Sequence, residues 1–300
     1  MLSYTVYGII ETALFQQCRE AVQHIAENGS DSLRLTLTEE VPRAFYERRA
    51  KWVADSLLHQ PEATVVAVCD GDGSLLTGEE LLSKVQQVTS FKLIQVGEWS
   101  ADSYAVLAEK AWRKFLRERG NRYCWMEVQV GGELAGRILM ELYAKLLPRT
   151  THNFCSLCSG DMDEVTPQGS SEPITLHYKG TTFFRVLKDA WVMGGDVSPG
   201  HKGTGGYSIY GRYFPDESFS VAHDDAGIVG MCNDGEHTNA SSFYITRKKM
   251  SWMNNHYVAF GRVIDGMDIV DRIHDTEVKH NQAPRTTITI VDCGELDVSL

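Results

Sequence analysis

The chain has 300 residues, 43% of them hydrophobic, which is enough for two domains that each bury their own core. Its formal net charge of −11 disfavours nucleic acid and anionic membranes as partners, because both need a cationic footprint. No apolar run reaches about eighteen residues, and the start of the chain lacks the basic residues of a signal peptide. We therefore expect a cytoplasmic protein with no nucleic-acid and no membrane partner.

The first ninety residues alternate between strand-like and helix-like patterns. The segment Thr77-Gly78-Glu79-Glu80 has the spacing of a capping box, so it predicts the start of a helix. The expected elements, in order, are a strand over 4–10, a helix over 12–27, a strand over 33–37, a helix over 43–59, strands over 64–69 and 75–76 around a turn at 70–73, and a helix over 77–88.

The turn at residues 70–73 also resembles the start of a calcium loop, because Asp70, Asp72 and Ser74 have the alternating spacing of its first ligands. The glycine that such a loop requires is replaced by Leu75, and the glutamate at its twelfth position is replaced by Leu81. A β-hairpin turn explains the same residues without a metal.

Residues 3–90 follow the order β-α-β-α-β-β-α, which resembles the thioredoxin/glutaredoxin fold. The redox chemistry of that family needs a low-pKa thiolate at the start of the first helix. Here the segment Ile10–Phe15 has no cysteine, Cys18 follows one turn too late, and Ala63-Thr64-Val65 lacks the proline that normally precedes the third strand. The resemblance implies a small α/β domain over residues 1–98, with a binding or scaffolding role in place of redox activity.

Residues 100–119 predict a helix with apolar residues on one face, charged residues on the other and Ser100 as its candidate N-cap. Such a helix suits a connection between domains, which we place at residues 99–121. From Tyr123 the pattern changes to short strands and turns. A hairpin is expected over 124–142 around Gly131-Gly132, followed by a helix over 150–158.

Seven cysteines, an odd number, are expected to be reduced thiols because no export signal is present. Cys155 and Cys158 have Cys-x-x-Cys spacing, which leaves a zinc or redox site open. No second Cys/His pair has ligand spacing, and Phe154 and Leu157 predict the buried face of a helix. We favour small, half-buried helix residues at both cysteine positions.

The second half of the chain carries an ordered series of motifs that resembles the cyclophilins, an eight-stranded barrel fold with peptidyl-prolyl isomerase activity. The resemblance covers residues 123–296 and implies a mostly-β cyclophilin-like domain over 122–300, with 161–174 as an inserted loop and 203–206 as a surface loop. The matching segments are 136–143, 148–154, 177–180, 183–196, 203–211, 214–217, 227–231, 239–246, 260–263 and 266–267.

Prolyl isomerisation requires rotation about an amide bond whose barrier is about 18–20 kcal/mol. An enzyme lowers this barrier by holding the proline ring in an apolar pocket and aiming a fixed cation at the amide. No metal and no cofactor is needed. The resemblance implies that Arg185 is the catalytic cation, in contrast to an arginine in an ordinary surface ion pair.

The resemblance also implies a set of substrate-binding residues, although ordinary barrel packing remains an alternative for Trp191, Met193 and Tyr244. Several positions depart from the family pattern. Met253 replaces a leucine, Tyr244 a phenylalanine and Trp191 a methionine. Four changes are less benign: Ala190 replaces a phenylalanine, Met193 and Ser242 replace glutamines, and Tyr257 replaces a histidine. We expect these changes to weaken or abolish isomerase activity. The expected substrate-binding residues are Asn233, Trp191, Met193, Tyr244, Trp252, Met253 and Tyr257.

The two-domain arrangement resembles a cyclophilin-like family of motile cilia and flagella. It implies an interaction or structural protein of the axoneme, docked on doublet microtubules, with tubulin or other axonemal proteins as partners. The alternative is an active peptidyl-prolyl isomerase that acts on a cytosolic or axonemal client. In both cases the expected ligand of the barrel is a proline-containing peptide or protein.

Overall fold

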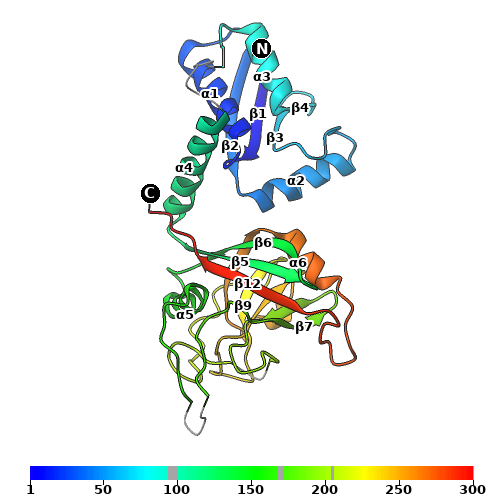
Figure 1. The fold of residues 1–300 in the computed structure, drawn as a ribbon. Helices are drawn as coiled ribbons and strands as arrows, with labels where there is room; N and C mark the ends of the chain where they lie inside the picture. The colour runs from blue at the N-terminus through cyan, green and yellow to red at the C-terminus, as the bar shows by residue number, and fades with distance from the viewer. Residues whose placement is uncertain (94–100, 168–171, 204–205, 300) are drawn as a thin grey trace. The chain divides into compact units, whose positions relative to one another are not determined.

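The computed structural model describes residues 1–93, 101–167, 172–203 and 206–299, and Figure 1 shows its fold. The chain divides into two compact units, one of Met1–Arg119 with Val298–Leu300 and the other of Gly120–Asp297. The expected domain boundary at residue 98, the candidate cap Ser100 and parts of the loops at 161–174 and 203–206 lie outside the described residues. Within the described ranges, every helix is too short or too polar to cross a membrane.

The first unit is a four-stranded mixed sheet with helices. Its sheet order is β2-β1-β3-β4, with β1 parallel to β2 and antiparallel to β3. The β3–β4 hairpin turns over the residues that resembled a calcium loop. The elements are β1 (Leu2–Ile9), α1 (Ala13–Asn28), β2 (Leu33–Glu40), α2 (Pro42–Ala54), β3 (Val65–Cys69), β4 (Leu75–Thr77), α3 (Gly78–Val88) and α4 (Ala101–Arg119).

Capping residues set the starts of two helices in this unit. Thr77 accepts a hydrogen bond from the backbone N–H of Glu80, whose carboxylate accepts one from the Thr77 N–H, so the predicted capping box is confirmed. At the start of α1, the Thr12 hydroxyl accepts from the backbone N–H of Phe15 and donates to the Ile9 carbonyl.

The prediction for α2 was wrong at its C-terminal end. The helix stops at Ala54, five residues before the predicted end at His59. Ser56 adopts a left-handed conformation with φ of 57°, which no helix residue can keep. The chain then turns back, so that Leu58 is buried against Phe45.

The core of the first unit forms around the apolar face of α1. Phe15, Cys18 and Ala21 are fully buried there, and burial raises the pKa of the Cys18 thiol to about 12. Helix α4 packs against α1, and the Tyr104 hydroxyl donates to the Glu20 carboxylate across this contact at 2.8 Å.

The second unit is an eight-stranded antiparallel barrel in the order β12-β5-β6-β11-β9-β10-β8-β7. A bridge between Thr182 and Thr289 joins the two ends of the sheet, so the barrel is nearly closed. The strands are β5 (Arg122–Val130), β6 (Glu133–Leu142), β7 (Phe183–Leu187), β8 (Trp191–Gly194), β9 (Ile228–Met231), β10 (Phe243–Thr246), β11 (Ala259–Asp265) and β12 (Ile288–Glu295).

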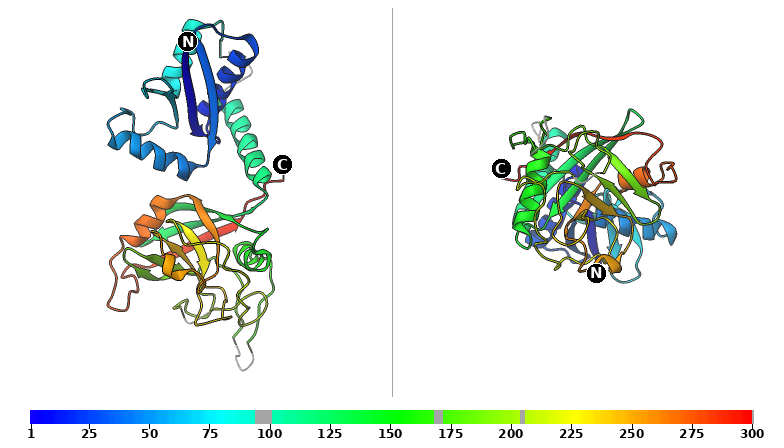
Figure 2. Two further views of the ribbon diagram at one scale, coloured as in Figure 1. Left: turned by 180° about the vertical axis from the view of Figure 1, so that it is seen from behind. Right: turned by 90° about the horizontal axis from the view of Figure 1, so that it is seen from below.

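Two helices cover opposite sides of the barrel, α5 (Pro148–Ser159, bright green) and α6 (Met267–His274, orange), as Figure 2 shows. Helix α5 begins at Pro148, two residues earlier than predicted, because proline is well tolerated in the first turn of a helix. Its Phe154 ring packs against the rings of Tyr178, Phe243 and Phe260, at centroid distances of 5.1–5.3 Å.

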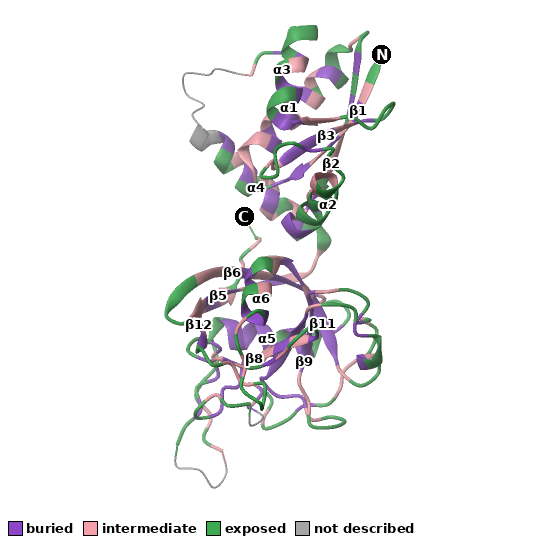
Figure 3. Cartoon of the chain, turned by 90° about the vertical axis from the view of Figure 1, so that its right-hand side faces the viewer, coloured by how far each residue is buried: buried purple, intermediate pink, exposed green. Residues whose placement is uncertain are grey.

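Cys155 and Cys158 are both fully buried in this core, so the prediction of half-buried positions was wrong. Sulfurs of Cys124 and Cys155 lie 3.5 Å apart, and all seven cysteines are free thiols. Burial raises the pKa of Cys158 to about 11. Figure 3 shows buried residues, in purple, concentrated in the barrel strands.

Candidate functional site

A row of three side chains crosses the strands on one face of the barrel sheet. Arg185 of β7 lies directly opposite Met193 of β8, and Met193 lies directly opposite Tyr244 of β10. Directly opposed residues on neighbouring strands share a face of the sheet, so these three side chains are neighbours. The sheet register alone therefore brings together residues that are up to 59 positions apart in the sequence (244 − 185 = 59).

This row lines a cavity of about 240 Å³, several times the ~30 Å³ that a molecule of liquid water occupies. The cavity has room for a small ring, and it brings together every predicted site residue except Trp252. Trp252 lines a neighbouring recess of about 770 Å³. The predicted residues in the first cavity are Arg185, Trp191, Met193, Asn233, Tyr244, Met253 and Tyr257.

The apolar side of the cavity is a small cluster separate from the main barrel core. Buried Tyr244, Met250 and Met253 form its base, and Trp191 and Met193 pack against them. Ala190 belongs to this base but does not line the cavity, whereas Trp191 does. The ring of Trp191 lies 5.7 Å from that of Trp252, so an aromatic pair stands at the edge of the cavity.

Tyr244 is held from beneath by a buried histidine. The Asn254 side-chain oxygen accepts hydrogen bonds from the backbone N–H of His223 and from its ring Nδ1, at 2.8 and 2.9 Å. The other ring nitrogen, Nε2, is then an acceptor, and the Tyr244 hydroxyl donates to it at 2.5 Å. Burial lowers the pKa of His223 and raises that of Tyr244, so both groups stay neutral.

The tyrosine hydroxyl also depends on the residue opposite it. Gly230 of β9 pairs with Tyr244 in the sheet, and a Cβ atom at Gly230 would collide with the tyrosine hydroxyl and ring. The hydroxyl thus occupies the space that the missing side chain of Gly230 leaves.

Two polar groups of the cavity have no partner within the described part of the chain. The exposed Arg185 guanidinium makes no hydrogen bond or ion pair there, and its cross-strand neighbour Met193 offers only a weakly accepting thioether. Ser242 also lines this cavity, and its hydroxyl, which is buried in the wall, has no partner among the described residues.

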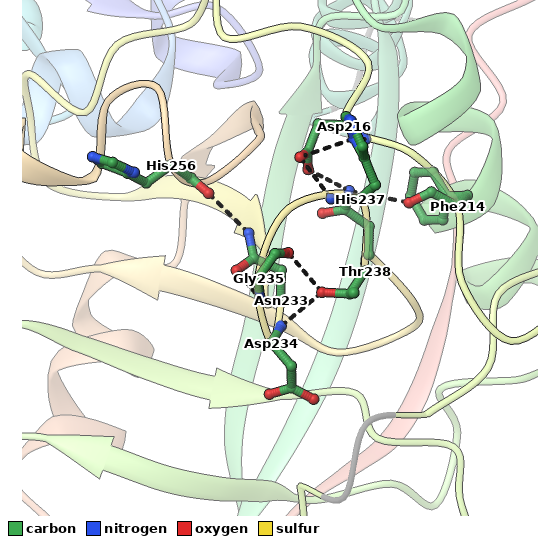
Figure 4. Close-up of polar contacts among 9 residues, drawn as sticks. Phe214, Asp216, Asn233, Asp234, Gly235, His237, Thr238 and His256 are labelled. Atoms are coloured by element: carbon green, nitrogen blue, oxygen red, sulfur yellow. Dashed lines mark hydrogen bonds and ion pairs between the residues drawn. The ribbon is translucent and has the colours of Figure 1, made fainter.

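A tight turn holds Asn233 at the rim, as Figure 4 shows. The side-chain amide of Asn233 donates to the His256 carbonyl at 2.9 Å. Thr238 closes the turn, because its hydroxyl accepts from the Asp234 N–H and donates to the Gly235 carbonyl. The carboxylate of Asp234 points away from these bonds.

Several residues of the site were not predicted from the sequence. Cys232 and Asp234 also line the cavity, and they could have been found because they flank Asn233. His223 and Asn254 carry no local signal, since their contact depends on the barrel closing. Among the described residues, no group of three or more His, Cys, Asp or Glu side chains is arranged to hold a metal ion.

Comparisons with known proteins agree with this architecture. Residues 125–295 match the family model "Cyclophilin type peptidyl-prolyl cis-trans isomerase/CLD". A protein of Bos taurus named "Probable inactive peptidyl-prolyl cis-trans isomerase-like 6" is 29% identical over 300 residues, covering 98% of this chain and 93% of that protein. The NK-tumor recognition protein of Mus musculus is 38% identical over 177 residues, which cover 59% of this chain and 12% of that protein. The matched family model, the nearly closed barrel and the cavity together show that the chain belongs to the cyclophilin-type peptidyl-prolyl cis-trans isomerase family.

Proposed function

We propose that the barrel binds proline-containing segments of a partner protein and catalyses their cis–trans isomerisation slowly or not at all. The observation that carries this proposal is the pairing of Arg185 with Met193 across β7 and β8. Met193 lacks the strong hydrogen-bonding groups that would fix the guanidinium, and a catalytic cation must be preorganised to stabilise a transition state. The match to a protein named "Probable inactive peptidyl-prolyl cis-trans isomerase-like 6" fits a cyclophilin with a degraded site.

Binding needs less preorganisation than turnover, and the cavity keeps what binding needs. Trp191, Met193 and Met253 supply an apolar wall, while the exposed guanidinium of Arg185 offers a polar contact. The burial of a proline ring against such a wall contributes about 25 cal/mol for each Å² of apolar surface removed from water.

An active isomerase is the second candidate, and the presence of Arg185 and Asn233 around one cavity favours it. Exchange NMR on a proline peptide separates the two. We expect the peptide to bind, with shifts in the peptide signals, while its cis–trans exchange rate rises little above the uncatalysed rate. A large acceleration that Arg185→Ala abolishes would overturn the binding-only proposal.

For the first unit we propose a thioredoxin/glutaredoxin-like domain without redox activity. The order β1-α1-β2-α2-β3-β4-α3 matches the order on which the resemblance rests. Cys18 is buried with its pKa raised to about 12, so almost none of it is the reactive thiolate near neutral pH. We propose that this domain docks the protein on a partner. The proposed division of the chain is a thioredoxin/glutaredoxin-like domain at 1–98, a connecting helix at 99–121 and a cyclophilin-like domain at 122–300.

The cellular part of the proposal is a structural or interaction role in the axoneme of cilia or flagella, with tubulin or another axonemal protein as the partner. It rests on the resemblance of the two-domain arrangement to the ciliary family. Detergent extraction of ciliated cells that express the tagged chain tests it. We expect the protein to stay with the axonemes, and full release into the soluble fraction would refute the axonemal role.

A further inference from the structure

A second recess adjoins the proline-sized cavity and shares part of its wall. Its volume is about 770 Å³, and Asn233, Asp234 and Tyr257 line both spaces. A peptide whose proline occupies the first cavity would therefore extend a neighbouring residue into the second. Successive residues of an extended chain are about 3.3–3.6 Å apart, so adjoining spaces suit residues close in sequence.

The recess is acidic, and its carboxylates are not neutralised by the protein. Asp216, Asp234 and Glu236 line it. No described lysine or arginine lines the recess or lies within ion-pair distance of these three carboxylates. The side chain of Asp216 is only 4% exposed and accepts hydrogen bonds from the backbone N–H of His237 and from the Asn239 amide, at 2.9 and 2.7 Å.

His237 lies beside Asp216 and pairs with neither of the other two carboxylates. Its ring Nδ1 accepts a hydrogen bond from the backbone N–H of Asp216 at 3.1 Å and lies 3.2 Å from the Asp216 carboxylate. Figure 4 shows these two residues facing each other across the turn. Among the described residues, no ion pair joins His237 to Asp234 or Glu236.

Aromatic faces line the same recess. Trp252 is 55% exposed and Phe219 is 37% exposed, so both rings are accessible to a ligand in the recess. Trp252 also packs edge-on against Tyr257, whose ring reaches the first cavity. An aromatic face next to carboxylates attracts a cation, and arginine above all, through both cation–π and charge-assisted contacts.

The recess joins the cavity that holds Arg185, whose guanidinium makes no hydrogen bond or ion pair among the described residues. A ligand that occupied both spaces would therefore meet the carboxylates of the recess and the cation of the cavity.

We propose that the recess lined by Asp234, Glu236 and Trp252 is a specificity subsite that selects an arginine or lysine close to the bound proline. The proposal rests on the proposed function, because it names the class of peptide that the proline cavity accepts. It implies that the partner presents a basic proline segment.

Titration of the full chain with matched peptides tests this. Each peptide contains one proline in an alanine background, with Arg, Ala or Glu placed in turn at the two positions before and the two positions after it. At one of these positions we expect Arg to lower Kd by about fivefold relative to Ala, and Glu to raise it. Equal affinities of the Arg and Ala peptides at all four positions would overturn the subsite.

The readout in variants is the ratio of the Ala-peptide Kd to the Arg-peptide Kd, so that a general loss of affinity cancels. We expect D234N/E236Q to bring this ratio close to one, and Trp252→Ala to reduce it. The control D161N/D163N removes the same charge from an exposed segment that lines neither space, and its ratio should match that of the wild type. The proposal would be overturned if the ratio stayed unchanged in D234N/E236Q. It would also be overturned if the ratio fell in the control, because the preference for arginine would then come from the overall negative charge of the protein.

The outcomes for the two proposals can be told apart. If no proline peptide binds, the proposed function and the subsite both fall. If the alanine-background peptide binds without preference for a basic neighbour, the proline site stands and only the subsite is lost. A peptide with Arg but with alanine in place of proline should bind at least about tenfold more weakly than its proline counterpart, since the apolar contact is lost.

Discussion

The start of α1 in the first unit and the cavity in the barrel differ in how their polar groups are paired. Thr12 satisfies its hydroxyl within the chain, as both donor and acceptor, and Cys18 is sealed in the core. Arg185 keeps an unpartnered guanidinium at the cavity, and the Ser242 hydroxyl is unpartnered within the cavity wall. The first arrangement stabilises a fold, and the second leaves hydrogen-bonding capacity for another molecule. Four predictions test this difference.

The largest expected effect is on catalysis. Met193→Gln places an amide opposite Arg185 with almost no change in volume, so it should orient the guanidinium and raise the isomerisation rate by up to on the order of 100-fold. Exchange NMR on a proline peptide measures the rate. Met193→Leu is the matched control, because it changes the side chain without adding an amide. Equal rates for the two variants would show that orientation of Arg185 is not the limiting defect.

The second prediction concerns the support beneath the cavity. Tyr244→Phe removes the hydroxyl that donates to His223 Nε2 and leaves that buried nitrogen without a partner. We expect a loss of about 1–3 kcal/mol in the stability of the barrel, measured by hydrogen exchange of the β10 amides. Exchange in β1 and α1 provides the internal reference and should not change. A barrel of unaltered stability would mean that this hydrogen bond contributes nothing.

The third prediction is a pH dependence of the barrel. Burial lowers the pKa of His223 and of His274 below the ordinary value of 6.5. In the unfolded chain both rings take up protons near pH 6.5, while in the folded barrel they do so only at lower pH. Stability is therefore fully present above about pH 6.5 and falls as the pH drops toward the folded pKa values, by about 1.4 kcal/mol per histidine per pH unit.

Thermal unfolding between pH 7.5 and 5.5 measures this loss. Both ring nitrogens of His274 lack a partner among the described residues, so His274→Leu should reduce the pH dependence at little cost in hydrogen bonding. The same decline in the variant as in the wild type would exclude His274 as a source of the effect.

The smallest expected effect lies in the first unit. Thr12→Ala removes the N-cap of α1 and should cost about 1 kcal/mol in the stability of that helix, with Thr12→Ser as the control that keeps a capping hydroxyl. Hydrogen exchange of the first turn of α1 measures the loss. If the alanine and serine variants were equally stable, the Thr12 hydroxyl would not be a structural group.

Features set by local pattern were predictable, and features set by the closing of the fold were not. The Thr77 capping box and the Gly131-Gly132 hairpin were found because a few adjacent residues specify them. The early end of α2 was missed, since nothing in serine requires the left-handed conformation of Ser56. In the site, the motif around Arg185 identified its strand, yet Met193 and Tyr244 became its neighbours only through the register of three strands.

The recess beside the cavity was not predicted for the same reason. Asp216 and Trp252 are 36 positions apart (252 − 216 = 36), and neither carries a signal that it shares a wall with Glu236. Trp252 was expected among the substrate-binding residues; it lines the recess and meets the first cavity through its contacts with Trp191 and Tyr257.

The fit between Gly230 and the Tyr244 hydroxyl constrains how this site can change over evolution. A side chain at position 230 is excluded while the tyrosine is present, because its Cβ would occupy the place of the hydroxyl. A side chain at this position requires both the hydroxyl and the ring of Tyr244 to move, and loss of the hydroxyl leaves Nε2 of His223 without a hydrogen-bond donor. Gly230, Tyr244 and His223 therefore depend on one another. A single substitution at any of them destabilises the floor of the pocket, and only a joint replacement could give it another packing.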